Sequence, residues 1–155
     1  MKKITAMLCT VLMAVSLTAC GGGEKKKEVT VDVEKLAEEL LTTVTTDTLA
    51  KMSVDPSTVY FYEADDVAKV AAYASSGTTA CEVAVIESKD ASKTGEIAKL
   101  LQDRVENQET LYSSYNAEEA AKLKDAIIKE AGSYSVLCVC DDTDQAEKIL
   151  KEYGF

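Results

Sequence analysis

The feature that most limits what this chain can fold into is an apolar run that ends early. Ile4 to Leu17 is broken only by two threonines and a serine, and it follows the positive start Met1-Lys2-Lys3. A membrane-spanning helix needs about 20 apolar residues, whereas this run has the length and flanks of a secretory signal peptide. The glycines and charged residues that follow it have nothing to bury. We therefore predict a cleaved leader over residues 1–19, a flexible tether over 20–31 and a single domain over 32–155.

The end of the apolar run indicates how the leader is removed. Leu17-Thr18-Ala19-Cys20 resembles the bacterial lipobox, in which a cysteine receives a diacylglyceryl group before the signal is cut. The resemblance implies a covalent lipid on Cys20, and we expect no other cofactor and no metal. Two acyl chains hold a protein at a membrane stably, whereas one chain holds it marginally. A palmitate-type membrane anchor would keep the secreted chain at the outer face of the cytoplasmic membrane.

Composition excludes several classes of function. A net charge of −10 argues against nucleic acid and against an anionic membrane surface as partners. The chain contains no histidine, which removes Ser-His-Asp and Cys-His catalysis, imidazole metal ligands and the usual pH switch. We expect a non-catalytic binding or adaptor module, whose partner is a neighbouring membrane protein or a small ligand.

Hydrophobic periodicity predicts one α+β domain. In chain order the pattern favours a helix over 32–43, strands over 58–62, 67–75 and 80–87, a long helix opening at 90–94, a short helix over 117–124, strands over 126–131 and 134–140, and a helix after Asp142. The order is α-β-β-β-α-α-β-β-α. We expect an antiparallel sheet of about five strands, with the helices packed on one face.

One face of the long helix combines polar and aromatic residues. These residues recur at i, i+4, i+8 and i+11, and they are Arg104, Gln108, Tyr112 and Tyr115. An arginine held near a core needs a carboxylate, and Glu82 in the preceding strand is the obvious counterion. Two interpretations stay open: a structural ion pair between helix and sheet, or a polar ligand pocket walled by Tyr112, Tyr115 or Tyr134.

Three cysteines fall within the predicted domain. Cys138 and Cys140 lie two apart in a strand, so they point to the same face at a separation of about 6.6 Å, too far apart for a comfortable disulfide with each other. Cys81 could pair with either of them if the strands adjoin. We favour small buried apolar residues over a disulfide. A thiol or redox enzyme that uses Cys81, Cys138 and Cys140 is the alternative function.

Three motifs along the chain are similar to those of one bacterial family. They are Glu82 within Ala80-Cys-Glu-Val-Ala84, the series from Arg104 to Tyr115, and Gly132-Ser-Tyr134 before an apolar strand. From about Val54 onward the chain resembles the small lipoproteins of Gram-positive bacteria that form the domain-of-unknown-function 4358 family. In that family a proline commonly follows the helix-ending tyrosine, whereas this chain has Asn116-Ala117 there. The resemblance implies the fold and the extracytoplasmic compartment, and it implies no activity.

Overall fold

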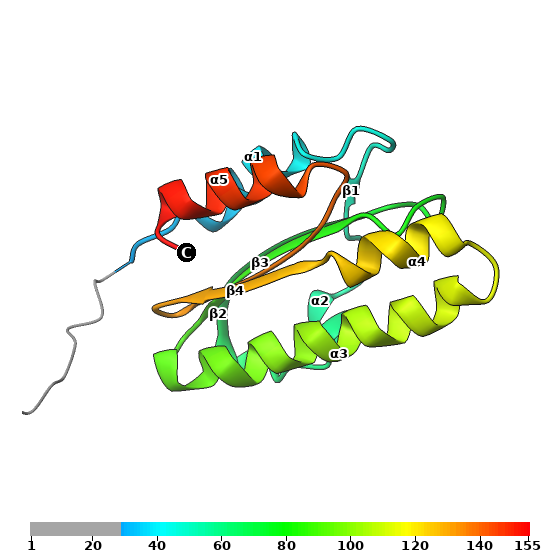
Figure 1. The fold of residues 1–155 in the computed structure, drawn as a ribbon. Coiled ribbons are helices and arrows are strands. Elements are labelled where there is room, and N and C mark those ends of the chain that lie inside the picture. The colour runs from blue at the N-terminus through cyan, green and yellow to red at the C-terminus, as the bar shows by residue number, and fades with distance from the viewer. Residues whose placement is uncertain (1–28) are drawn as a thin grey trace, which may run out of the picture.

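The computed structural model describes residues 29–155, and this part of the chain folds into three layers (Figure 1). Its helices are α1 (Val33–Leu41), α2 (Pro56–Tyr60), α3 (Thr94–Ser113), α4 (Ala117–Lys124) and α5 (Thr143–Tyr153). Its strands are β1 (Ala50–Lys51), β2 (Val67–Ala74), β3 (Glu82–Ser88), β4 (Ile127–Ala131) and β5 (Tyr134–Val139). The predicted signal peptide and Cys20 lie outside the described residues. Within 29–155, no helix combines the length and the apolar character needed to cross a bilayer.

The strands form one open antiparallel sheet with the order β1-β2-β3-β5-β4. β3 and β5 occupy its centre, paired from Glu82 opposite Val139 to Glu87 opposite Tyr134. The predicted α+β class with a five-stranded antiparallel sheet is therefore confirmed, as is the hairpin of β4 and β5.

The helices cover both faces of the sheet, which corrects the expectation that they gather on one. In Figure 1, α1 and α5 lie on one side of the strands and α3 and α4 on the other. Two separate apolar clusters fill the two interfaces, one including Leu36 and Leu150, the other including Leu101 and Leu123. Every residue of β5 is buried, because a central strand between two helical layers has no solvent-facing side.

The predicted strand over residues 58–62 is wrong, because this segment forms α2. Asp55 caps the helix by accepting a hydrogen bond from the backbone N–H of Ser57 at 2.9 Å, and Pro56 occupies the first turn. Both are strong helix-start signals, and here they outweigh the β propensity of Thr58 to Tyr62. The helix ends at Phe61, whose φ of 61° is left-handed. A first strand does exist, but it is the two-residue β1, which pairs with β2.

Three other helices, α1, α4 and α5, begin after a capping residue. Asp32, Asn116 and Asp142 each accept a hydrogen bond from a backbone N–H three residues later. The inner side of α3 is shorter than its apolar pattern suggests. Tyr112 is buried, whereas Leu111 and Tyr115 are largely exposed where the helix runs past the sheet.

Candidate functional site

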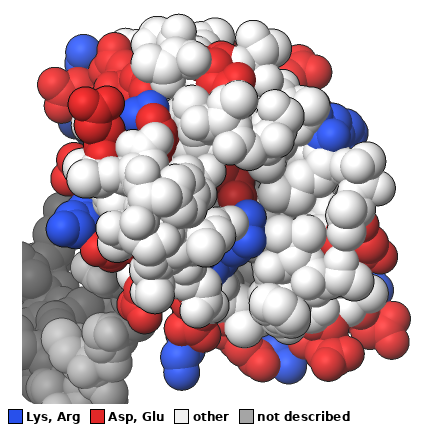
Figure 2. Space-filling view, turned by 90° about the vertical axis from the view of Figure 1, so that its right-hand side faces the viewer, with Lys and Arg blue, Asp and Glu red and all other residues white. Residues whose placement is uncertain are grey.

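The polar residues predicted on the long helix meet the sheet near the turn between β2 and β3. Figure 2 shows the side of the molecule that lies at the right of Figure 1, where charged atoms of both signs lie in a recess among uncharged side chains. Glu82, the first residue of β3, points to the α3 face of the sheet, as do Ala84 and Ile86 two and four residues later. Arg104 reaches it from the middle of α3.

Glu82 and Arg104 form a two-pronged ion pair. Nη2 of Arg104 donates to Oε2 of Glu82 at 2.8 Å, and Nε donates to Oε1 at 3.3 Å. The carboxylate side chain is only 7% exposed, whereas 25% of the arginine side chain is exposed. Burial disfavours the guanidinium charge, but the hydrogen bonds and attraction of Glu82 outweigh it and raise the pKa of Arg104. The pair ties helix to sheet and leaves one side of the guanidinium open.

Gln108 completes the surroundings of the guanidinium. Its amide orientation is fixed by its neighbours, and with the carbonyl oxygen turned toward Arg104 it accepts hydrogen bonds from Nη1 and Nη2 at 2.7 Å. One turn further along α3, the Tyr112 hydroxyl donates to the backbone carbonyl of Thr79 at 2.7 Å. The exposed ring of Tyr115 stacks at a tilt on Tyr112, with 5.1 Å between centroids.

Tyr134 does not join this group, contrary to one of the two interpretations. It opens β5 on the opposite face of the sheet and packs with the cluster beneath α1 and α5. Its hydroxyl donates to Glu87 at 3.2 Å, its partner across the strands. Tyr112 therefore supplies the aromatic lining of the smaller cavity described below, and Tyr115 lies outside it.

Two adjoining cavities open beside Arg104, and we call them together the Arg104 hollow. The smaller one, of about 110 Å³, has Glu82, Arg104, Gln108 and Tyr112 in its lining. The larger one, of about 290 Å³, lies between β1 and α2 and has the apolar side chains of Met52, Val54 and Val59 in its lining. Arg104, Ala74 and Ser75 line both cavities. The apolar wall was not predicted, because Val59 lies in the segment predicted as a strand, and Met52 and Val54 lie where no element was predicted.

A carboxylate missed by the sequence analysis holds the rim of the hollow. Oδ2 of Asp47 accepts hydrogen bonds from Ser75 at 2.5 Å and from Thr78 and Thr79 at 2.9 Å. These side-chain hydrogen bonds, with the one from Ser75 largest, lower the pKa of Asp47 to about 2. Asp47 thereby fixes the turn between β2 and β3 that borders the smaller cavity.

Loss of the Tyr112 hydroxyl should weaken this rim. In Tyr112→Phe the carbonyl of Thr79 loses its donor, so we expect the free energy of unfolding to fall by about 1 kcal/mol. Urea denaturation measures the change. Tyr115→Phe is the matched control, because its ring is exposed and we expect a change within about 0.5 kcal/mol. Equal losses in both variants would contradict a specific role for the Tyr112 bond.

A second polar cluster, centred on Lys122 of α4, lies next to the hollow. Its ammonium contacts Asp141 at 2.8 Å and Glu119 at 3.0 Å, and all three side chains are largely buried. Glu119 also accepts from the backbone N–H of Ala80 at 2.7 Å. Asp141 accepts from the backbone N–H groups of the loop after α1, at Thr45 and Thr46. The cluster therefore joins four segments of the chain. It was not predicted, because its residues are not related by helical or strand spacing.

The three thiols lie close to this cluster, reduced and buried. Cys138 and Cys140 face the α1 side of β5, as their spacing predicts, and Lys122 lies 3.8 Å from the sulfur of Cys81. Desolvation raises the pKa of Cys81. The neighbouring Cys138 thiol lowers the pKa of Cys140, whereas Cys140 and burial raise the pKa of Cys138. Burial keeps reagents away from all three thiols.

We therefore expect the three thiols to resist alkylation in the native protein. Treatment of the full-length chain with iodoacetamide at pH 7.5 should leave Cys81, Cys138 and Cys140 unmodified by peptide mass analysis, because attack needs an accessible thiolate. The same protein unfolded in guanidinium is the control, and all three should then react. Selective labelling of native Cys140 would contradict this and would favour the thiol-enzyme alternative.

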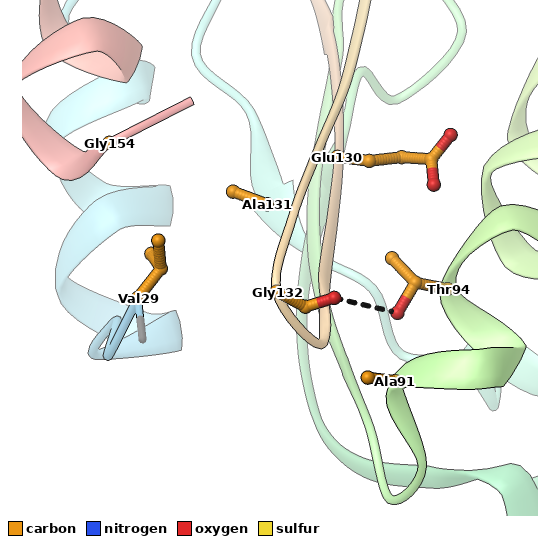
Figure 3. Close-up of a pocket in the computed structure, with 7 residues that line it drawn as sticks. All are labelled: Val29, Ala91, Thr94, Glu130, Ala131, Gly132 and Gly154. Atoms are coloured by element: carbon orange, nitrogen blue, oxygen red, sulfur yellow. Dashed lines mark hydrogen bonds between the residues drawn. The ribbon is translucent and has the colours of Figure 1, made fainter. Parts of the chain in front are cut away.

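A further cavity lies at the opposite end of the sheet, and few of the side chains in its lining are polar or charged. It measures about 270 Å³ and lies between the β4–β5 turn, the start of α3 and the end of α5. Figure 3 shows Val29 and Gly154 on one side of it and Thr94 on the other, with the Thr94 hydroxyl donating to the carbonyl of Gly132 at 3.2 Å. Glu130 is its single charged lining residue. Of the cavities described, the Arg104 hollow is the better candidate site.

Comparison with known proteins agrees with the family resemblance seen in the sequence. A family model described as Domain of unknown function (DUF4358) matches residues 56–140, more than half of the chain. The chain belongs to the DUF4358 family. The DUF4358 match begins at α2 and ends just after β5, so it includes the ion pair and the α3 side of the sheet and leaves out α1 and α5. We found no significant match to a curated protein or to a solved structure.

Proposed function

We propose that this protein is a non-catalytic binding module, anchored at the outer face of the cytoplasmic membrane by a lipid on Cys20, and that it binds a small ligand in the Arg104 hollow. The observation that carries the proposal is an arginine held in place by Glu82 and Gln108 while it lines two adjoining cavities. Small-molecule sites combine an apolar wall with a few well-placed polar groups. The hollow has this composition.

Binding accounts for the site better than catalysis does. The carboxylate of Glu82 is engaged by Arg104, and the nearby thiol of Cys81 is buried with a raised pKa. A nucleophile or general base needs a free, reactive form within reach of substrate. The residues that line the described hollow offer hydrogen bonds and apolar contact, which supports recognition without chemical change.

A protection experiment can test binding at this place. Arg104 is the only arginine in the sequence, so phenylglyoxal modification of arginine, located by peptide mass analysis, reports on the hollow. A chemically diverse small-molecule library is first screened by thermal shift on the full-length chain. Compounds that bind should slow the modification of Arg104 and should lose binding in Val59→Trp, which fills the larger cavity. Compounds that bind Val59→Trp equally well and give no protection would place the site elsewhere.

The proposed anchor has an independent test. In a host that processes lipoproteins, the chain should incorporate a clickable palmitate analogue and sediment with membranes. Cys20→Ser should remove both the label and the membrane association, because the thioether cannot form. Cys9→Ser, within the predicted leader, is the matched control and should leave both unchanged. Label that persists in Cys20→Ser would overturn the anchoring proposal.

A neighbouring membrane protein is the second candidate partner. Four large apolar side chains are exposed on the described surface, namely Val54, Phe61, Leu111 and Tyr115. Exposed apolar side chains that gather into a patch mark interaction sites. Crosslinking in native membranes, followed by purification and mass spectrometry, should recover one recurrent partner if the protein is an adaptor, and none if it only binds a small ligand.

A further inference from the structure

We infer that the Arg104 hollow takes a zwitterion with an apolar side chain, the chemical class of a free aliphatic α-amino acid. The inference rests on the proposed function, since it names the ligand of the same hollow. Its carrying observation is the meeting of three features in one place: a guanidinium, a carboxylate and an apolar wall.

The charges of Arg104 and Glu82 disfavour ligands that carry only a positive or only a negative charge. Arg104 and Glu82 lie 2.8 Å apart, so an anion that reaches the guanidinium also meets the carboxylate. A cation that reaches Glu82 meets the guanidinium in the same way. The net charge of −10 adds to the repulsion of anions. A ligand whose carboxylate and ammonium are attached to the same carbon can face both groups at once.

The guanidinium retains capacity for a ligand carboxylate. Of its five N–H groups, Glu82 accepts from Nε and Nη2, and Gln108 accepts from Nη1 and Nη2. One N–H of Nη1 remains. Gln108 itself lines the same cavity, next to this N–H.

The size and lining of the hollow fit a compact apolar side chain. The larger cavity, of about 290 Å³, adjoins the guanidinium, and its apolar lining comes from Met52, Val54 and Val59. Lys51 also lines it, but its ammonium is paired with Glu34 at 2.9 Å. The two cavities of about 110 and 290 Å³ together lie near the lower end of the roughly 300–1,000 Å³ of ligand pockets, so the hollow suits a small ligand. The polar end of such a ligand would lie toward Gln108, and its aliphatic end toward α2.

Three ligands of matched shape test the inference. The full-length chain, purified in detergent, is titrated by calorimetry with L-leucine, with 4-methylpentanoate and with 3-methylbutylamine. These share the branched chain and differ in carrying both charged groups, only the carboxylate or only the ammonium. We expect L-leucine to bind at least about tenfold more tightly than either analogue. Each analogue lacks one charged group, so either Arg104 or Glu82 would have no oppositely charged partner on the ligand. Glycine should also bind at least about tenfold more weakly, since it lacks the apolar group.

Variants locate the binding without depending on the ion pair. Gln108→Leu and Val59→Trp should each weaken L-leucine binding at least about fivefold, and both leave Glu82 and Arg104 in place. Lys129→Met, on the edge strand β4, is the control and should change nothing. Circular dichroism and urea denaturation check that each variant is folded.

The outcomes separate this inference from the proposed function. If 4-methylpentanoate or 3-methylbutylamine binds as tightly as L-leucine and loses affinity in Val59→Trp, the hollow is a binding site and the zwitterion is the wrong class. If no ligand of the series binds at millimolar concentration, the inference is overturned, and the library screen with phenylglyoxal protection decides the proposed function. L-leucine binding that both hollow variants leave unchanged overturns the inference as well.

Discussion

Replacing Arg104 with methionine should lower the free energy of unfolding by about 3–5 kcal/mol, one of the two largest losses we expect from a single change. The substitution leaves the carboxylate of Glu82, whose side chain is 7% exposed, without its cation. Removal of one partner of a buried pair is costly because the other charge stays desolvated. Urea denaturation at pH 7 measures the loss.

The double variant Glu82→Leu with Arg104→Met distinguishes a charge penalty from lost packing. When both charges are replaced by apolar groups, stability should recover to within about 1–2 kcal/mol of the parent. Lys129→Met is the matched control, because its pair with Glu147 at 3.0 Å is solvent-exposed and should contribute less than about 1 kcal/mol. Additive losses in the double variant would contradict the interpretation, since coupled residues deviate from additivity.

Lys122→Met should be similarly damaging, with a loss of about 3–5 kcal/mol. Its removal leaves Asp141 and Glu119, both largely buried, next to each other without a cation. These carboxylates also hold backbone N–H groups of two loops, so both loops should loosen. Hydrogen exchange of residues 43–48 and 75–81 should rise with the fall in stability. Lys124→Met is the control in the same helix, because its contact with Glu109 is exposed and measures 3.8 Å.

The same cluster predicts how stability depends on pH. Burial opposes the charge of Asp141, but hydrogen bonds from Lys122 and from the backbone of Thr46 and Thr45 hold its pKa well below the ordinary 3.8. A lowered folded-state pKa stabilises the fold above the unfolded pKa, and the contribution is lost as pH falls through the folded one. Stability should therefore decrease steeply below about pH 4, and less steeply in Asp141→Asn. Equal slopes in both proteins would contradict this role.

Most elements could be predicted because local signals determine where they begin. Asp32, Asn116 and Asp142 cap helices in the structure at the places where the sequence predicts a helix to begin. The predicted strand over residues 58–62 was wrong because β-favouring residues were given more weight than Asp55-Pro56, although a cap and a proline act directly on the backbone. The second helical layer was also foreseeable. The unbroken apolar run from Val136 to Cys140 is typical of a strand covered on both faces.

Only the part of the candidate site that lies on one helix and one strand could be predicted. Helical spacing brought Arg104, Gln108 and Tyr112 together, and the need for a counterion identified Glu82. Tyr134 was misplaced because its face depends on the register of β5, which the sequence does not reveal. Loop contacts such as Asp47 with Thr79, and Asp141 with Thr46, join residues far apart in the chain. The periodicity of the sequence does not reveal contacts between loops that are far apart in the chain.

The position of Val29 places the start of the described chain and the Arg104 hollow at opposite ends of the sheet. Val29 lies against Gly132 and Gly154, at the end of the sheet where Ser88 meets Ser133. Glu82 lies at the other end of β3, about 20 Å away at the rise of a strand. Nine residues from Cys20 to Val29 extend at most about 30 Å. A chain anchored through Cys20 would therefore be attached at the end of the sheet opposite the hollow, so the tether would not cover the mouth of the hollow.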